Sequence, residues 1–196
     1  MKITSEKDEK ATMVDVVGHL GMALIWLAPV WFVITSKKTA ATFVGVGFWF
    51  GVLPDIDLYL RRITGAIKHH GVIHTVLAVS VIALVVGPLV GRLLKRMIGG
   101  SEWFVLEAAD RATSFGFVMV WIAGLSHIFA DILSAPDISE AIEPLWPLYQ
   151  QSLGIDIVWY NNPWFNWGLL ILGLGLNAAL YYRSRNSPAR VSPDFP

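Results

Sequence analysis

The sequence predicts an all-α fold in which about five transmembrane helices form a polytopic membrane bundle. The chain has 196 residues, of which 55% are hydrophobic and only 15% are charged, whereas soluble domains carry about 25% charged residues. Its mean hydropathy is +0.56. Five separate segments approach the length of about 20 apolar residues that crosses a bilayer. Together these observations predict an integral membrane protein.

Length and residue usage narrow the remaining possibilities. We expect one integral-membrane domain over residues 1–183, followed by a flexible polar tail at 184–196 that contains prolines. The formal net charge is zero, which gives no electrostatic footprint for nucleic acid, so we expect no nucleic-acid partner. The chain has no cysteine, which excludes disulfides, thiolate ligands and Cys nucleophiles. Any bound metal must therefore be held by His, Asp or Glu.

Polar segments separate the five predicted spans. The first span follows thirteen polar residues of mixed charge, unlike the short basic start of a signal peptide, so we interpret it as a retained span. The second is rich in glycine and aromatic residues, which favours close packing against its neighbours. The predicted spans cover residues 14–34, 39–60, 72–94, 112–133 and 164–182.

The longest connection, residues 134–163, joins the fourth and fifth spans. It contains Trp146, Tyr149, Trp159 and Tyr160, several prolines, and no Lys or Arg. Trp and Tyr favour the headgroup level of a membrane, and a loop of this length is often functional. Two roles are open: an interfacial cover or lid, and a connector that rests on lipid.

Residues that can bind metal gather at one predicted membrane face. Successive spans run in opposite directions, so the start of the first, the end of the second, the start of the third and the end of the fourth lie on the same side. Those four places hold all five histidines of the chain and three aspartates: His19, Asp55, Asp57, His69, His70, His74, His127 and Asp131. Imidazole and carboxylate groups suit a hard or borderline divalent metal. The alternation therefore predicts a metal site at this face.

His127 and Asp131 form the most informative local pair. They are four residues apart, so they share one face of a helix. An ionised Asp within a span costs about 2.5–3.5 kcal/mol by insertion scales, and a metal ion or a buried partner must offset that cost. By contrast, a single histidine in an apolar span, such as His19, is more often a hydrogen-bonded packing residue than a ligand.

Asp55 and Asp57 lie where the second span ends. On a continuous helix they would point about 200° apart. Pro54 disfavours helical backbone for Leu53. We therefore expect the chain to leave helical geometry near the two aspartates.

The histidines before the third span have two spacings. His70 and His74 are four residues apart and would share a helix face if the helix already begins there. His69 and His74 are five apart and can converge only if His69 lies in the loop before the span. We expect His70 to support a ligand or to face the substrate.

Several motifs occur in a recognisable order: His19, LPDID at 53–57, HHGVIHT at 69–75, HIFAD at 127–131 and PLWPL at 144–148. In this order the chain resembles the YdjM-like family of membrane-bound metal-dependent hydrolases, also described as LexA-binding and inner-membrane-associated. The resemblance covers about residues 18–148. His70 stands where the family usually has Arg, and SAPD at 134–137 replaces the usual Thr and Gly after HxxxD.

The resemblance implies a metal-dependent hydrolase. Its metal-site residues would be those that match the motifs: His19, Asp55, Asp57, His69, His74, His127 and Asp131. Seven ligands exceed the four that one tetrahedral zinc takes, so we expect one or more divalent ions, zinc first. An Asp that is not a ligand, with Asp55 and Asp131 the candidates, would be the general base for a water that attacks a phosphoester or ester. A site at the membrane interface suggests membrane lipid as partner and a lipid or lipid-linked phosphoester as substrate.

Two other functions compete with hydrolysis. The cluster could be a non-catalytic scaffold that only holds the helices together. The chain could also translocate a divalent metal or protons, although transport sites usually lie near the bilayer midplane and these residues lie near one face.

Lys and Arg residues give the predicted orientation. Nine lie on the side opposite the metal face and six on the metal face. The positive-inside rule then places the metal face on the non-cytoplasmic side of the cell or inner membrane.

Overall fold

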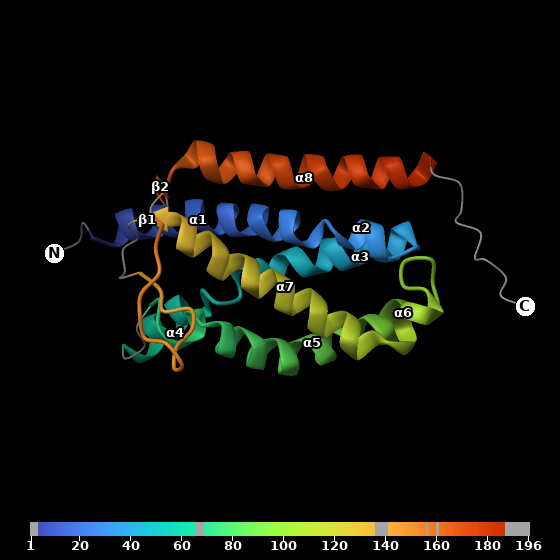
Figure 1. The fold of residues 1–196 in the computed structure, drawn as a ribbon, viewed down its shortest axis with the longest axis horizontal. Helices are drawn as coiled ribbons and strands as arrows, with labels where there is room; N and C mark the ends of the chain where they lie inside the picture. The colour runs from blue at the N-terminus through green and yellow to red at the C-terminus, as the bar shows by residue number, and fades with distance from the viewer. Residues whose placement is uncertain (1–3, 66–68, 136–140, 156, 160, 187–196) are drawn as a thin grey trace, which may run out of the picture.

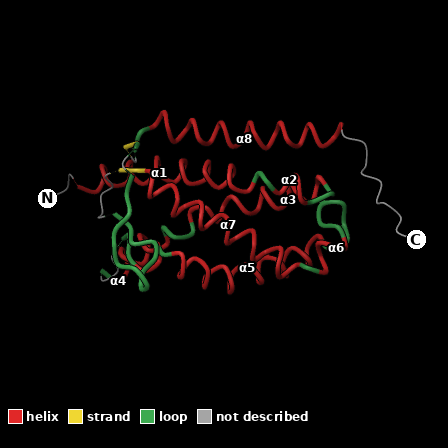
Figure 2. Tube along the Cα trace, viewed as in Figure 1, coloured by secondary structure: helices red, strands yellow, loops and turns green. Residues whose placement is uncertain are grey.

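The computed structural model describes residues 4–65, 69–135, 141–155, 157–159 and 161–186, and most of these are helical. Within them, five helical segments are long and apolar enough to cross a membrane: Val16–Val33, Lys37–Thr64, Val76–Ile98, Ala112–Leu133 and Pro163–Ser184. This confirms the predicted all-α bundle of five spans. Figures 1 and 2 show the spans side by side along the long axis of the molecule.

Helices make up each span, and two short strands lie in the last connection. In chain order the elements are α1 (Thr4–Leu27), α2 (Val30–Val33), α3 (Lys37–Gly47), η1 (Phe48–Val52), α4 (Ile56–Thr64), η2 (Val72–His74), α5 (Val76–Ile98), α6 (Leu106–Asp110), α7 (Ala112–Leu133), β1 (Ser134–Ala135), β2 (Val158–Trp159) and α8 (Pro163–Asn186). Below, the end of the bundle at α4 is called the α4 end, and the opposite end, at α6, the α6 end (Figure 1).

Helix α7 lies at the centre of the bundle. It packs against α5, α1, η1 and α3, and Figure 1 shows it crossing diagonally between α1 and α5. The core at this crossing includes Leu27, Phe43, Phe115 and Met119, and the Phe43 and Phe115 rings meet edge to face with centroids 5.0 Å apart. Helix α8 packs mainly on α1 and lies at the outer edge of the bundle.

Glycines let α5 and α7 approach closely. A Cβ atom at Gly91 would lie 1.7 Å from the Ala112 carbonyl oxygen, and one at Gly116 would lie 1.9 Å from the Gly87 carbonyl oxygen. Side chains there are impossible without moving a helix. Close approach through small residues is the usual way that membrane helices gain packing energy in lipid, where no hydrophobic force drives them together.

The first and third spans differ in detail from the prediction. The first is broken by a turn at Ala28 and Pro29, after which α2 continues. The third was expected from residue 72, but α5 begins at Val76 because the preceding residues form η2. The helix begins there because Thr75 is its N-cap, with the side-chain oxygen accepting from the Ala78 amide at 3.0 Å.

The second span leaves α-helical geometry before the aspartates, as predicted, but by another route. Leu53 keeps helical torsions (φ −63°, ψ −39°), so the effect expected from Pro54 on Leu53 is wrong. The change comes earlier, where α3 gives way to the tighter helix η1, and a turn then leads into α4.

The described part of the connection 134–163 lies at the α4 end, where Figure 2 shows long loop segments. Within it β1 and β2 pair in parallel. Ile142 is buried at 1% exposure, and the Pro144 carbonyl accepts from the Val76 amide at 2.9 Å. The described part of the connection is therefore anchored to the start of α5.

The end of the chain was predicted as a flexible tail from residue 184. Helix α8 continues to Asn186, so the first three residues of that segment are helical. The rest of the predicted tail, 187–196, lies outside the described residues.

Candidate metal centre

Four segments bring the predicted metal-site residues together at the α4 end. Helix α1 supplies a histidine, and the junction of η1 and α4 supplies the two aspartates of the LPDID motif. The segment before α5 supplies two histidines, and the last turns of α7 supply the His and Asp of the HIFAD motif. Each side chain is no more than 11% exposed. The seven residues are His19, Asp55, Asp57, His69, His74, His127 and Asp131. The expected clustering at one face is confirmed.

The turn between η1 and α4 directs both aspartates inward. Asp55 has φ −65° and ψ 0° and precedes the first residue of α4, whereas Asp57 lies in its first turn. The Asp57 amide donates to the Pro54 carbonyl at 3.3 Å. A continuous helix would have pointed the two carboxylates apart. Because a turn replaces the helix here, both carboxylates can face the cluster.

His127 has its tautomer fixed by a backbone carbonyl. Its Nδ1 atom lies 2.7 Å from the Gly51 carbonyl oxygen, and because a carbonyl only accepts, Nδ1 carries the proton and donates. In a neutral ring Nε2 then holds a lone pair. A Cβ at Gly51 would lie 2.6 Å from the Ala23 Cβ and 3.0 Å from the His19 carbonyl oxygen, so only glycine lets this carbonyl approach α1 and α7 together.

Asp57 stands behind two histidines. His69 Nδ1 lies 2.9 Å from Asp57 Oδ1, and His74 Nδ1 lies 3.1 Å from Asp57 Oδ2. A carboxylate beside Nδ1 favours the proton on that nitrogen and directs the Nε2 lone pair away from it. One buried carboxylate therefore contacts both rings, through a hydrogen bond to His69 and by proximity to His74.

The inward-facing atoms converge within a narrow range of distances. His74 Nε2 and His127 Nε2 are 3.2 Å apart. Asp131 Oδ2 lies 3.3 Å from His127 Nε2, Asp131 Oδ1 lies 3.4 Å from His19 Nε2, and Asp55 Oδ1 lies 3.4 Å from His127 Nε2. Zinc–nitrogen bonds of about 2.0–2.1 Å in a tetrahedron put donor atoms about 3.3–3.4 Å apart. The spacing of the donors fits a small divalent ion.

Charge leads to the same conclusion. Lone pairs and carboxylate oxygens that face one another in a buried site repel unless a cation lies between them. Asp131 Oδ2 is buried and, within the described residues, makes no hydrogen bond. Donor atoms fall within 4.8 Å of one another in three groups. Two of them share His69 and His74, and the third is separate: Asp55, Asp57, His69 and His74; His69, His70 and His74; and His19, His127 and Asp131. These groups can hold a metal ion.

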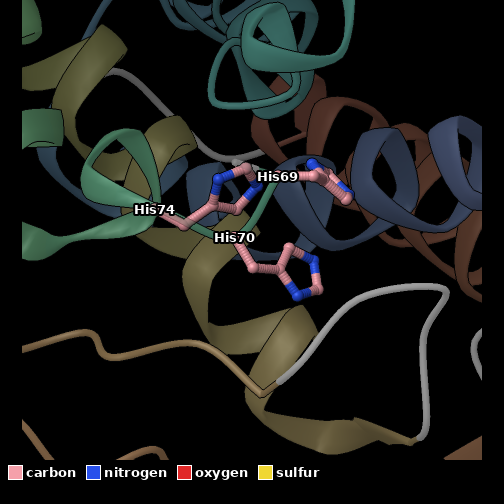
Figure 3. A group of neighbouring side chains, drawn as sticks. All are labelled: His69, His70 and His74. Atoms are coloured by element: carbon pink, nitrogen blue, oxygen red, sulfur yellow. The ribbon is translucent and has the colours of Figure 1, made fainter. Parts of the chain in front are cut away.

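His70 lies at the rim of the cluster. Figure 3 shows it beside His69 and His74, with ring centroids 4.3 Å and 4.9 Å from theirs. Its φ is +58°, in the left-handed region that few residues other than glycine adopt. Because α5 begins only after η2, the helical i, i+4 relation considered for His70 and His74 does not apply. His69 lies in the turn before η2, which is the condition stated for its convergence with His74.

Sequence reasoning missed two groups at the site. The Gly51 carbonyl is a backbone group, so no side chain in the sequence indicates its role. The only available signal was the glycine-rich end of the second span. The other is Asn166 on α8, only 4% exposed, which lines a cavity of about 20 Å³ together with His19 and Gly18. That volume is about the size of one water molecule.

Comparisons with known proteins give one match. Residues 13–191 match the model of the family described as YdjM inner membrane protein. No curated protein matches the chain, and no solved structure matches it.

Proposed function

The chain belongs to the YdjM inner membrane protein family, and from that premise we propose that it is a membrane-embedded hydrolase in which the His/Asp cluster holds a divalent metal ion, zinc first. The substrate would be a phosphoester or an ester at the membrane interface. The observation that carries this proposal is the convergence of the His74 and His127 Nε2 atoms, 3.2 Å apart, with the Asp55 and Asp131 carboxylates within 3.4 Å of the His127 Nε2 atom.

The proposal divides the residues between two tasks. His19, His127 and Asp131 would hold the ion, because their donor atoms lie within 4.8 Å of one another. His74 would join them, because its Nε2 atom lies 3.2 Å from that of His127. Asp57 and His69 would lie outside the ligand shell and support it. Asp57 contacts Nδ1 of both His69 and His74, and carboxylates in such outer positions fix the orientation of ligand rings. A second ion would instead make Asp57 and His69 ligands, and the ratio of zinc to protein distinguishes the two arrangements.

Asp55 is the better candidate for general base. It is the most exposed of the three cluster aspartates, with 11% of its side chain accessible. Its Oδ1 faces His74 and His127, which leaves the other oxygen to accept a proton from an attacking water. A bound divalent ion would polarise the ester oxygen and lower the pKa of that water.

Lipid is the proposed source of the substrate. Close to the cluster along the chain, the last connection and the start of α8 expose Leu148 at 94%, Trp159 at 53% and Trp164 at 88%. Apolar and aromatic side chains of this kind partition into the headgroup region. A phosphoester of a lipid or a lipid-linked compound would meet the site from that layer.

We place the cluster on the non-cytoplasmic side, from the distribution of Lys and Arg. Because the chain has no cysteine, single cysteines can report the side directly. Ser152→Cys at the α4 end should react with a membrane-impermeant maleimide in intact cells, and Glu102→Cys at the α6 end should not. The reverse pattern would move the site to the cytoplasm.

The decisive experiment is the metal content of detergent-purified protein by elemental analysis. We expect at least one zinc per chain in wild type and less than a tenth of that in His127→Ala. Lys95→Gln is the control, because Lys95 lies at the α6 end in an exposed ion pair, and it should keep its zinc. Equal metal content in wild type and His127→Ala would disprove the metal centre. If the expected difference is found, the metal-loaded protein can be screened against phosphoesters.

One observation favours a scaffold as the second candidate. If both rings carry a proton on Nδ1, a hydrogen bond across the 3.2 Å between the His74 and His127 Nε2 atoms requires a second proton on one ring, and Asp55 and Asp131 could compensate this imidazolium as they would a metal ion. The cluster would then tie the helices together without a metal. Wild-type protein that stays metal-free after incubation with zinc would support this scaffold.

A further inference from the structure

A second hollow lies at the other end of the bundle. A groove of about 1280 Å³ opens between α1–α2 and α6–α7. Its deep part is lined by apolar side chains, including Trp26, Val30, Val118 and Ile122. Its mouth, at the α6 end, is lined by charged and hydroxyl residues. None of the His/Asp cluster residues lines it.

The depth of the groove corresponds to one leaflet of a bilayer. From Arg111, which precedes the first residue of α7, to Ile122 at the deep end there are eleven residues. At 1.5 Å per residue this is a rise of about 16 Å, and the hydrocarbon core is about 30 Å thick. The groove therefore begins at an interface and ends near the midplane, which is the reach of one acyl chain.

The mouth carries both signs of charge, from Glu107 in α6 and from Arg111 directly after it. Arg111 and Glu107 are four residues apart, and neither makes an ion pair within the part of the chain that the structure describes. Asp110 is different, since it pairs with Lys95 at 3.6 Å. The groove thus offers one guanidinium and one carboxylate that are both available to a ligand.

We propose that this groove binds one phospholipid of the leaflet at the α6 end, with a preference for phosphatidylethanolamine. Arg111 contacts the phosphate, because a guanidinium matches phosphate oxygens in a bidentate fashion. Glu107 accepts from the primary ammonium, which has N–H donors that a quaternary choline lacks. An anionic headgroup satisfies Arg111 but is repelled by Glu107. One acyl chain fills the apolar groove beneath.

Native mass spectrometry of the full chain tests this proposal. Protein in detergent is supplied with equal amounts of phosphatidylethanolamine, phosphatidylglycerol and phosphatidylcholine. We expect one tightly held phosphatidylethanolamine on wild type. Val118→Trp should fill the groove and lower its occupancy at least tenfold. Leu84→Trp is the matched control, since Leu84 is 61% exposed on α5 and does not line the groove.

Charge variants test the headgroup contacts separately. Arg111→Gln should weaken binding of all three lipids, whereas Glu107→Gln should shift the preference toward phosphatidylglycerol. Normal zinc content and thermal unfolding of Val118→Trp show that the variant folds. Equal retention by Val118→Trp and Leu84→Trp, or no preference among the lipids, would mean that only surrounding bilayer lipid is held and would overturn the proposal. A wild-type dimer that Val118→Trp dissociates would also overturn it, because a second copy would then occupy the groove.

Discussion

At the α4 end of the bundle polar side chains are buried and face one another, whereas at the α6 end they are exposed and form separate ion pairs. His74, His127 and Asp57 have no accessible side-chain surface. The α6-end pair of Lys95 and Asp110 is 52% and 76% exposed. Exposed pairs of this kind contribute about 0–1 kcal/mol, but buried charges destabilise unless they are compensated. The difference agrees with the proposed metal site at the α4 end and with contact to solvent and headgroups at the α6 end.

Zinc removal should give the largest difference between the two ends. At a zinc concentration of one thousand times the dissociation constant, binding stabilises the folded state by about 4 kcal/mol. Stripped wild type should therefore unfold at a lower temperature and recover on addition of zinc, and His127→Ala should not respond. Lys95→Gln, at the α6 end, should keep the full zinc-dependent shift. A wild type indifferent to zinc would contradict this expectation.

Asp57→Asn should weaken zinc binding about 10- to 100-fold without abolishing it, because loss of an outer-sphere partner of ligand histidines typically costs that much. Competition with a zinc chelator measures the affinity. Asp110→Asn is the control at the α6 end and should leave the affinity unchanged. Complete loss of zinc in Asp57→Asn would identify Asp57 as a ligand.

Alanine substitutions at two glycines of the second span distinguish the effect of packing at the site from the effect of helix propensity. Gly51→Ala would force a Cβ to within 2.6 Å of Ala23, and such overpacking costs about 1–3 kcal/mol. Gly45→Ala meets no atom within 4 Å and should stabilise helix α3 by up to about 1 kcal/mol. Thermal unfolding of both variants compares them, and equal effects would mean that the Gly51 contact is unimportant.

The smallest effect is expected for Glu102→Gln at the α6 end. The Lys38 ammonium, which donates to this carboxylate, lowers the pKa of Glu102 below its usual value of 4.5. A lowered pKa stabilises the folded state above the unfolded-state pKa, and this contribution is lost as the pH falls through the folded-state pKa. The variant should thus unfold slightly earlier than wild type at pH 7 and together with it at strongly acidic pH. A difference that persists in 1 M salt would argue against an exposed ion pair.

Much of this molecule could be predicted from sequence, for physical reasons that vary by element. The fourth span, predicted at 112–133, is α7 with the same bounds, because an uninterrupted apolar run is flanked by Arg111. The third was predicted four residues too early, since apolar Val72 and Ile73 suit a span equally well. Thr75, the N-cap of α5, is a residue type that favours helix starts, but a hydropathy pattern does not take capping into account.

The site was predictable at one level only. Alternation of spans was enough to gather the His and Asp residues at one face, because it requires no knowledge of side-chain orientation. Which nitrogen of His127 points inward depends on the Gly51 carbonyl, a backbone group. The position of Asn166 beside His19 depends on how α8 lies on α1. Neither the orientation of the His127 ring nor the position of Asn166 can be recognised from the spacing of residues in the sequence.

The order of the donors along the chain also has a consequence for biosynthesis. The proposed ligands run from His19 on α1 to His127 and Asp131 near the end of α7, so the last two emerge from the ribosome only when the fourth span has been made. No partial chain that ends before α7 carries the complete set. Metal capture in the growing protein would then report that four helices have been inserted and docked, whereas the groove at the α6 end, lined from Trp26 to Ile122, is complete slightly earlier.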